Sequence, residues 1–80
     1  MQHATIVVRA EWDEEAGVWV ASSEDVAGLS LEADNLERLK DKVLGALHDL
    51  IELNGLRYET PDIPVHFMAE HLYRIRNPCQ

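Results

Sequence analysis

Residues 34–55 read DNLERLKDKVLGALHDLIELNG, and their apolar positions recur at the spacing of an α-helix. Asn35 is a good N-cap, Glu37 suits the positive start of a helix, and Gly55 after Asn54 predicts its end. One set of side chains spans an arc of roughly 100°, the usual width of a stripe that packs on a sheet: Leu36, Leu39, Val43, Ala46, Leu47 and Leu50.

Leu44 and Ile51 widen this stripe toward the end of the predicted helix, to an arc of about 160°. One face of a sheet rarely needs so wide a stripe. Either the following segment or another chain covers the extra part, and the sequence leaves both open. We therefore take Leu44 and Ile51 as candidate contacts for self-association.

Three short strands are predicted before the helix. Residues 5–12 alternate, with Ile6, Val8, Ala10 and Trp12 on one side. Residues 13–17 form a polar turn that ends on a glycine, so residues 18–23 return as the second strand of a hairpin. Both faces of that strand are apolar, and the pattern does not decide which is inner. Residues 29–33 form a brief third strand.

After the helix, residues 56–62 are a connector, and the alternation of residues 65–76 predicts a fourth strand. Twelve residues are long for so small a sheet, so this strand either bends or pairs at its far end with a second molecule. The order strand, strand, strand, helix, strand predicts a single domain, residues 1–80, of the two-layer α+β class, in which one helix packs on an antiparallel sheet.

The net charge of −8 lies entirely in the first half of the chain. Residues 1–37 contain nine acidic residues and Arg9 alone among the basic ones, whereas the rest contains six of each sign. Such a surface repels phosphate, so we expect no direct binding to nucleic acid. It attracts a basic partner, although acidic turns also simply keep a small protein in solution.

Size and composition set further expectations. A chain of 80 residues buries a marginal core, which favours a homo-oligomer. The sequence contains no apolar run of the roughly 20 residues that span a membrane, and residues 1–5 do not resemble a signal peptide. Cys79 is the only cysteine, so no internal disulfide forms and we expect a cytoplasmic protein.

Two short motifs carry a family resemblance: Asp25-Val26-Ala27-Gly28, and Asp34-Asn35-Leu36-Glu37 at the helix start. With Trp19 at the aromatic position of the second strand, residues 5–54 resemble the HicB-like domains of bacterial toxin–antitoxin systems. Asp62-Ile-Pro-Val65 also resembles a subgroup of small stand-alone members. The sequence departs from the family pattern at Ala27, Asn35 and Arg38, where proline, threonine and glutamate are usual.

This resemblance implies a partial RNase-H-like sheet with one helix and no nuclease activity. It further implies that the domain neutralises a small basic RNA-cleaving toxin. Most antitoxin members also carry a C-terminal DNA-binding module, and we expect none here because the chain leaves no room for one after the last predicted strand.

The residues themselves offer little catalytic chemistry. Glu11 and Asp13 end the first strand, where one acid of a metal-dependent nuclease would lie. A solvated hairpin turn explains Asp13, Glu14 and Glu15 better. His66 and His71 fall on opposite faces of their strand, and His48 is isolated on the helix. Together with His3 and Cys79 they form no Cys/His cluster at the spacing of a zinc site. We therefore predict no catalytic residue, no metal site and no cofactor.

Trp12 and Trp19 flank the hairpin beside several carboxylates, so they are candidate interface or core residues rather than base-stacking ones. The sequence thus predicts a non-enzymatic protein-binding domain of HicB-like antitoxin type, which binds a small basic toxin-like protein and is itself oligomeric. The alternatives are a self-assembling structural or regulatory domain without a toxin partner, and a metal-dependent nuclease.

Overall fold

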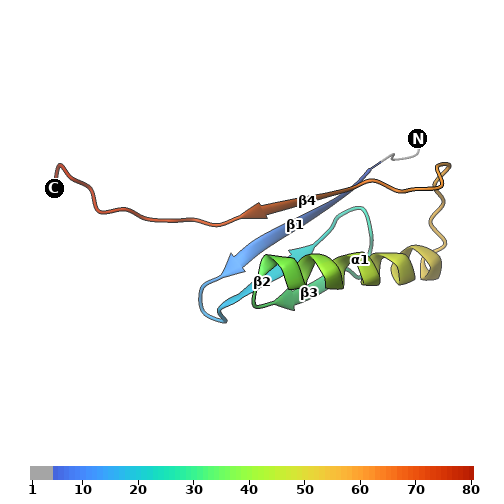
Figure 1. Cartoon of the computed structure of the whole chain (residues 1–80), viewed down its shortest axis with the longest axis horizontal. Helices are drawn as coiled ribbons and strands as arrows, with labels where there is room; N and C mark the ends of the chain where they lie inside the picture. The colour runs from blue at the N-terminus through green and yellow to red at the C-terminus, as the bar shows by residue number, and fades with distance from the viewer. Residues whose placement is uncertain (1–4) are drawn as a thin grey trace.

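The computed structural model describes residues 5–80 (Figure 1). Within this range, strands β1 (Ile6–Asp13), β2 (Val18–Ser22) and β3 (Ser30–Ala33) come first, and helix α1 (Leu36–Leu53) and strand β4 (Val65–Glu70) follow. The strands form one sheet in the order β3-β2-β1-β4, with α1 against one face. The predicted two-layer α+β class is confirmed. Over the same residues, no helix combines the length and apolarity needed to cross a bilayer.

The hairpin between β1 and β2 forms because its turn satisfies its own backbone. Asp13 Oδ1 accepts hydrogen bonds from the N–H groups of Glu15 (3.1 Å) and Ala16 (3.2 Å). Gly17 donates its N–H to the carbonyl oxygen of Asp13 (2.8 Å) and adopts a φ of 68°, which glycine tolerates without strain. The structure therefore gives Asp13 a role in the turn.

Helix α1 begins and ends where the sequence predicts. The side chain of Asn35 accepts a hydrogen bond from the N–H of Arg38 (2.8 Å), and Gly55 follows the last turn with a φ of 65°. The predicted stripe faces the sheet, with Leu39, Val43 and Leu47 buried. The buried core consists of Ile6, Val8, Ala10, Ala21, Val26, Leu29, Ala33, Leu39, Val43 and Leu47.

One part of the topology differs from the prediction. The sequence predicts an antiparallel sheet, whereas β4 pairs parallel with β1, so the sheet is mixed. The helix explains why. Strand β3 ends level with the hairpin, because Ala33 pairs with Trp19 and Trp19 with Trp12. Eighteen helical residues then carry the chain about 27 Å along the sheet to its opposite end, so β4 must run toward the hairpin, as β1 does.

Strand β4 is also shorter than predicted. It pairs with β1 from Val65 to Glu70, and residues 71–77 belong to no helix or strand. They continue in line with β4 and leave the body of the molecule as a single extended segment (Figure 1). This segment gives the chain its elongated shape of 55 × 24 × 18 Å.

Candidate protein-binding surface

Four aromatic rings gather at the hairpin end of the sheet, from β1, β2 and the residues that follow β4. The ring centroids of Trp12 and Trp19 are 5.5 Å apart in an edge-on arrangement. The ring of His71 lies 5.5 Å from Trp12 and 5.7 Å from Trp19, and that of Tyr73 lies 4.1 Å from His71. We call Trp12, Trp19, His71 and Tyr73 the aromatic cluster.

Strand register explains how the aromatic cluster forms. Trp12 and Trp19 are directly paired, so their side chains point to the same face of the sheet. Ala10 pairs with Ala69 of β4, which places His71, two residues further on, on that same face beside Trp12. Helix α1 starts at Leu36, just after the level of Trp19, and runs away from the hairpin. The cluster is therefore only partly covered.

The two tryptophans have different surroundings. Both are half-buried, but Trp19 packs against the buried core, whereas Trp12 contacts the rings of Trp19 and His71. Tyr73 is 76 % exposed. The cluster therefore has a fixed inner member and progressively more open outer members, an arrangement that suits an anchor for another polypeptide.

Three carboxylates and Arg74 lie near the aromatic cluster. Glu14 and Trp12 line a surface hollow of about 660 Å³ together with residues 71–74, and Glu14 Oε2 lies 3.9 Å from His71 Nε2. A neighbouring hollow of about 400 Å³ is lined by Trp12 and His71 together with Glu11 and Glu70, whose side chains point to the other face of the sheet. Glu11 and Glu14 are exposed, so their negative charge reaches a partner that approaches the cluster.

Leu44 and Ile51 line a different hollow. A groove of about 350 Å³ runs between one side of α1 and the residues that enter β4, and its other apolar members are Leu47, Ile63 and Val65. We call it the helix groove. Leu44 is 48 % exposed, so the following segment covers only part of the extra apolar stripe. The structure thus brings the two predicted tryptophans into contact and places the two predicted helix residues in one groove, at a different part of the surface.

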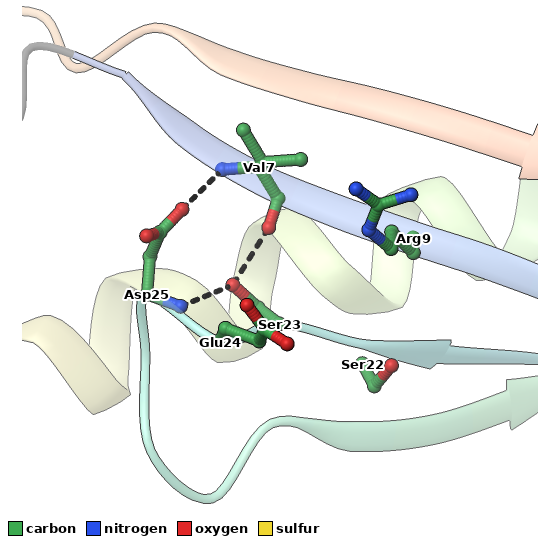
Figure 2. A pocket seen from close by; sticks show the side chains of 6 residues that line it. All are labelled: Val7, Arg9, Ser22, Ser23, Glu24 and Asp25. Atoms are coloured by element: carbon green, nitrogen blue, oxygen red, sulfur yellow. Dashed lines mark hydrogen bonds between the residues drawn. The ribbon is translucent and has the colours of Figure 1, made fainter.

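A third hollow lies where the chain leaves β2, and hydrogen bonds explain it (Figure 2). The N–H of Val7 donates to Asp25 Oδ2 (2.8 Å), and Ser23 Oγ donates to the carbonyl oxygen of Val7 (2.7 Å). The N–H of Asp25 donates in turn to Ser23 Oγ (3.1 Å). Because β2 pairs with β1 only as far as Arg9, these side chains satisfy the next backbone groups of β1. The residues around this hollow therefore hold the start of β1 and the end of β2 together.

Metal-binding residues are not brought together in the described part of the chain. Across residues 5–80, no three side chains of the His, Cys, Asp and Glu types are grouped to hold an ion. His48 and His66 are exposed and His71 belongs to the aromatic cluster, while His3 lies outside the described residues.

His71 and Tyr73 are the members of the aromatic cluster that sequence reasoning did not select. The alternation of residues 65–76 places them on one face, but only the parallel register with β1 brings them to Trp12. The length of the predicted helix could have indicated this register. A helix of 18 residues ends at the side of the sheet away from the hairpin, so β4 begins there and runs parallel to β1.

Comparisons with known proteins agree with the fold. Residues 5–77 match the family model described as "Domain of unknown function (DUF1902)". Among solved structures, the hypothetical protein TTHA1013 from the extremely thermophilic bacterium Thermus thermophilus is 42% identical, with a TM-score of 0.71. That match covers 91% of this chain and 99% of the other. No curated protein matches the chain. The HicB-like resemblance is not part of these findings and stays a prediction.

Proposed function

The chain belongs to the family described as a domain of unknown function (DUF1902), and from its surface we propose that it is a non-enzymatic domain that binds a small basic protein. The observation that carries the proposal is the aromatic cluster with carboxylates at its edge. Tryptophan and tyrosine supply much of the binding energy at protein interfaces, and Trp12, Trp19 and Tyr73 lie together here.

The charge around the cluster selects the class of partner. Glu11, Glu14 and Glu70 line the two hollows beside the rings, against Arg74 in one hollow and Arg9, which lies 3.6 Å from Glu70. The carboxylates outnumber these arginines, and residues 1–37 carry all of the net negative charge. A basic polypeptide gains attraction and a faster encounter from this arrangement, whereas a nucleic acid is repelled by it. A basic protein is therefore a better partner for the cluster than single-stranded RNA or DNA.

The sequence resemblance to HicB-like domains supports a more specific form of the proposal. In that form the basic partner is a small RNA-cleaving toxin, the domain blocks its activity as an antitoxin does, and the pair acts in the cytoplasm. The acidic hairpin end suits a partner that itself binds RNA, because carboxylates can pair with the basic side chains that otherwise contact phosphates.

A defined binding experiment tests the proposal. A small basic protein recovered from host lysate on the full chain is purified, identified, and titrated back by calorimetry. We expect Trp12→Ala and Glu14→Lys each to raise the dissociation constant by about tenfold or more, since both alter the cluster or its edge. The matched control is Glu59→Lys, an equal change of charge in the connector at the opposite end of the molecule (Figure 1).

Equal affinity of Glu14→Lys and Glu59→Lys for the recovered protein would show that the cluster is not the binding surface. The antitoxin form has its own readout, since the domain should suppress RNA cleavage by the purified partner. RNA cleavage by the domain alone with Mg²⁺ or Mn²⁺, abolished by Asp13→Asn, would replace the proposal by the nuclease alternative.

A further inference from the structure

The most unusual feature of the molecule is the segment that follows β4, residues 72–77, which we call the arm. It continues β4 in an extended conformation and projects from the body (Figure 1). Three large apolar side chains are exposed on it: Leu72 by 77 %, Tyr73 by 76 % and Ile75 by 90 %. An extended segment with exposed apolar side chains is typical of a strand that pairs with another chain.

The body has a free edge of matching length. Among residues 5–80, strand β4 lies at the border of the sheet and pairs with β1 along one side, and no other described strand pairs with its second side from Val65 to Glu70. Open backbone groups along this edge accept an added strand, a recurrent mode of recognition. The edge spans six residues and so does the arm, so each copy of the chain offers one strand and one place for a strand.

We propose that the arm pairs antiparallel with the β4 edge of a second copy, and that the two copies exchange arms about a twofold axis close to His71. Such an interface is self-complementary, because the arm of each copy occupies the edge of the other. It also turns the two sheets into one continuous sheet in which both β4 strands are internal.

Side-chain alternation supports this pairing. Residues directly opposite in an antiparallel pair point to the same face. An axis through residue 70 or 71 places Ile75 of one copy opposite Val65 or Phe67 of the other, on the face that carries α1. Val65 and Phe67 are half-buried. The helix groove, which contains Leu44 and Ile51, is also lined by Val65. Ile75 of the second copy can therefore pack into this apolar groove.

Charge identifies the occupant as this chain rather than the basic partner. Arg74 and Arg76 give the arm a formal charge of +2, so the rest of the chain carries −10 to make the total of −8. The proposed register places Arg74 and Arg76 opposite residues 64–68, away from the hairpin carboxylates. The arm is therefore attracted by the net negative charge of a second copy rather than by particular carboxylates, and it is repelled by a basic protein. Tyr73 belongs to both the arm and the aromatic cluster. The proposed self-association rests on Ile75, the β4 edge and the helix groove, none of which the proposed function uses.

The mass of the full chain in solution tests the proposal. One chain has a mass of 9.1 kDa, and light scattering should give twice this value, about 18 kDa. We expect Ile75→Asp to raise the dissociation constant of the dimer by about a hundredfold, because it places a charge against an apolar groove. Leu53→Asp is the matched control, an equal substitution at a residue 81 % exposed near the end of α1, and it should leave the dimer intact.

Amide hydrogen exchange and cysteine cross-linking test whether the arm and the β4 edge form the dimer interface. Alternate N–H groups among residues 72–76, those that point to β4 of the second copy, should exchange slowly in the wild-type dimer and at the rate of an unstructured peptide in Ile75→Asp. A single cysteine at Glu70 or His71, in a Cys79→Ser background, should form a disulfide across the axis on mild oxidation, because the two copies of that residue face each other. Native Cys79, at the tip of the chain, should cross-link far more slowly.

Three results would overturn the proposal. The first is a mass of 9.1 kDa for the wild-type chain at micromolar concentration. The second is a dimer that Ile75→Asp leaves unchanged, which would place the interface elsewhere. The third is an arm that becomes protected only when the basic protein is added, which would make that protein its occupant.

Discussion

Among single residues, Asp25 has the clearest structural role, because it continues the sheet without being part of a strand. Its carboxylate accepts the N–H of Val7 at 2.8 Å, and Ser23 accepts the N–H of Asp25 at 3.1 Å while donating to the carbonyl oxygen of Val7. These contacts hold the chain between β2 and β3 against the start of β1, where β2 no longer reaches (Figure 2). Val26, the next residue, is thereby fixed in the core.

We expect Asp25→Ala to lower the free energy of unfolding by about 1–2 kcal/mol, because the N–H of Val7 loses its acceptor in a half-buried position. Asp25→Asn keeps an acceptor oxygen and should retain most of the stability. Urea denaturation followed by tryptophan fluorescence measures both. The control is Glu24→Ala, an exposed neighbour whose change should stay within about 0.5 kcal/mol. Equal effects of Asp25→Ala and Glu24→Ala would contradict this role.

Residue-scale contacts of this kind were the hardest to predict. Asp25 reads in the sequence as part of a turn that interrupts a strand, and its partner Val7 lies 18 residues earlier. No local pattern connects the two. Asp13, by contrast, bonds only to Glu15 and Ala16 through its side chain, so the turn chemistry of residues 13–17 already predicts its role.

At the scale of elements, local signals predicted α1 well and β4 only in part. The cap at Asn35, the stop at Gly55 and the apolar stripe lie within or beside the helix itself, so the sequence contains everything that determines α1. The alternation of residues 65–76 is equally regular, but a strand also needs a neighbour, and β1 supplies one only as far as Glu70. Of the two predicted alternatives for this strand, a bend is not seen, because residues 71–77 continue in line with β4. Pairing of its far end with a second molecule stays a prediction.

The helix groove offers a second test of self-association at the element scale. We expect the double variant Leu44→Asp, Ile51→Asp to be monomeric by light scattering, since two charges then replace the apolar wall that receives Ile75. Ile51 also packs against the core, so this variant loses some stability, and circular dichroism must show that it remains folded. Leu44→Asp alone, at a residue 48 % exposed, should weaken the dimer without that cost. A folded Leu44→Asp protein with wild-type mass at all concentrations would show that the groove is empty in the dimer.

For the molecule as a whole, the uneven distribution of charge supports both the proposed basic partner and the proposed pairing of the arm. The acidic residues are concentrated in the hairpin half, which holds Trp12 and Trp19, while Arg74 and Arg76 lie on the arm. Composition alone predicted a basic partner from the net charge. It did not predict that the chain carries its own basic segment on an exposed extended arm, because that separation appears only once β4 is seen to leave the body (Figure 1).

Reversing the charge of the arm tests this organisation directly. The double variant Arg74→Glu, Arg76→Glu changes the arm from +2 to −2 while it leaves the apolar side chains of the arm in place. We expect the dissociation constant of the dimer to rise by about tenfold or more at about 50 mM salt, with a smaller difference at about 500 mM, where exposed charges are screened. Sedimentation equilibrium at both salt concentrations measures the change.

A matched double variant separates this attraction from general repulsion between two acidic copies. Arg38→Glu with Arg57→Glu alters the net charge by the same amount at exposed positions off the arm, so it reports the repulsion alone. If both double variants weakened the dimer equally at low salt, the attraction between arm and body would have no part in the assembly. A selective loss in the arm variant instead means that the basic arm recognises the acidic body of its second copy.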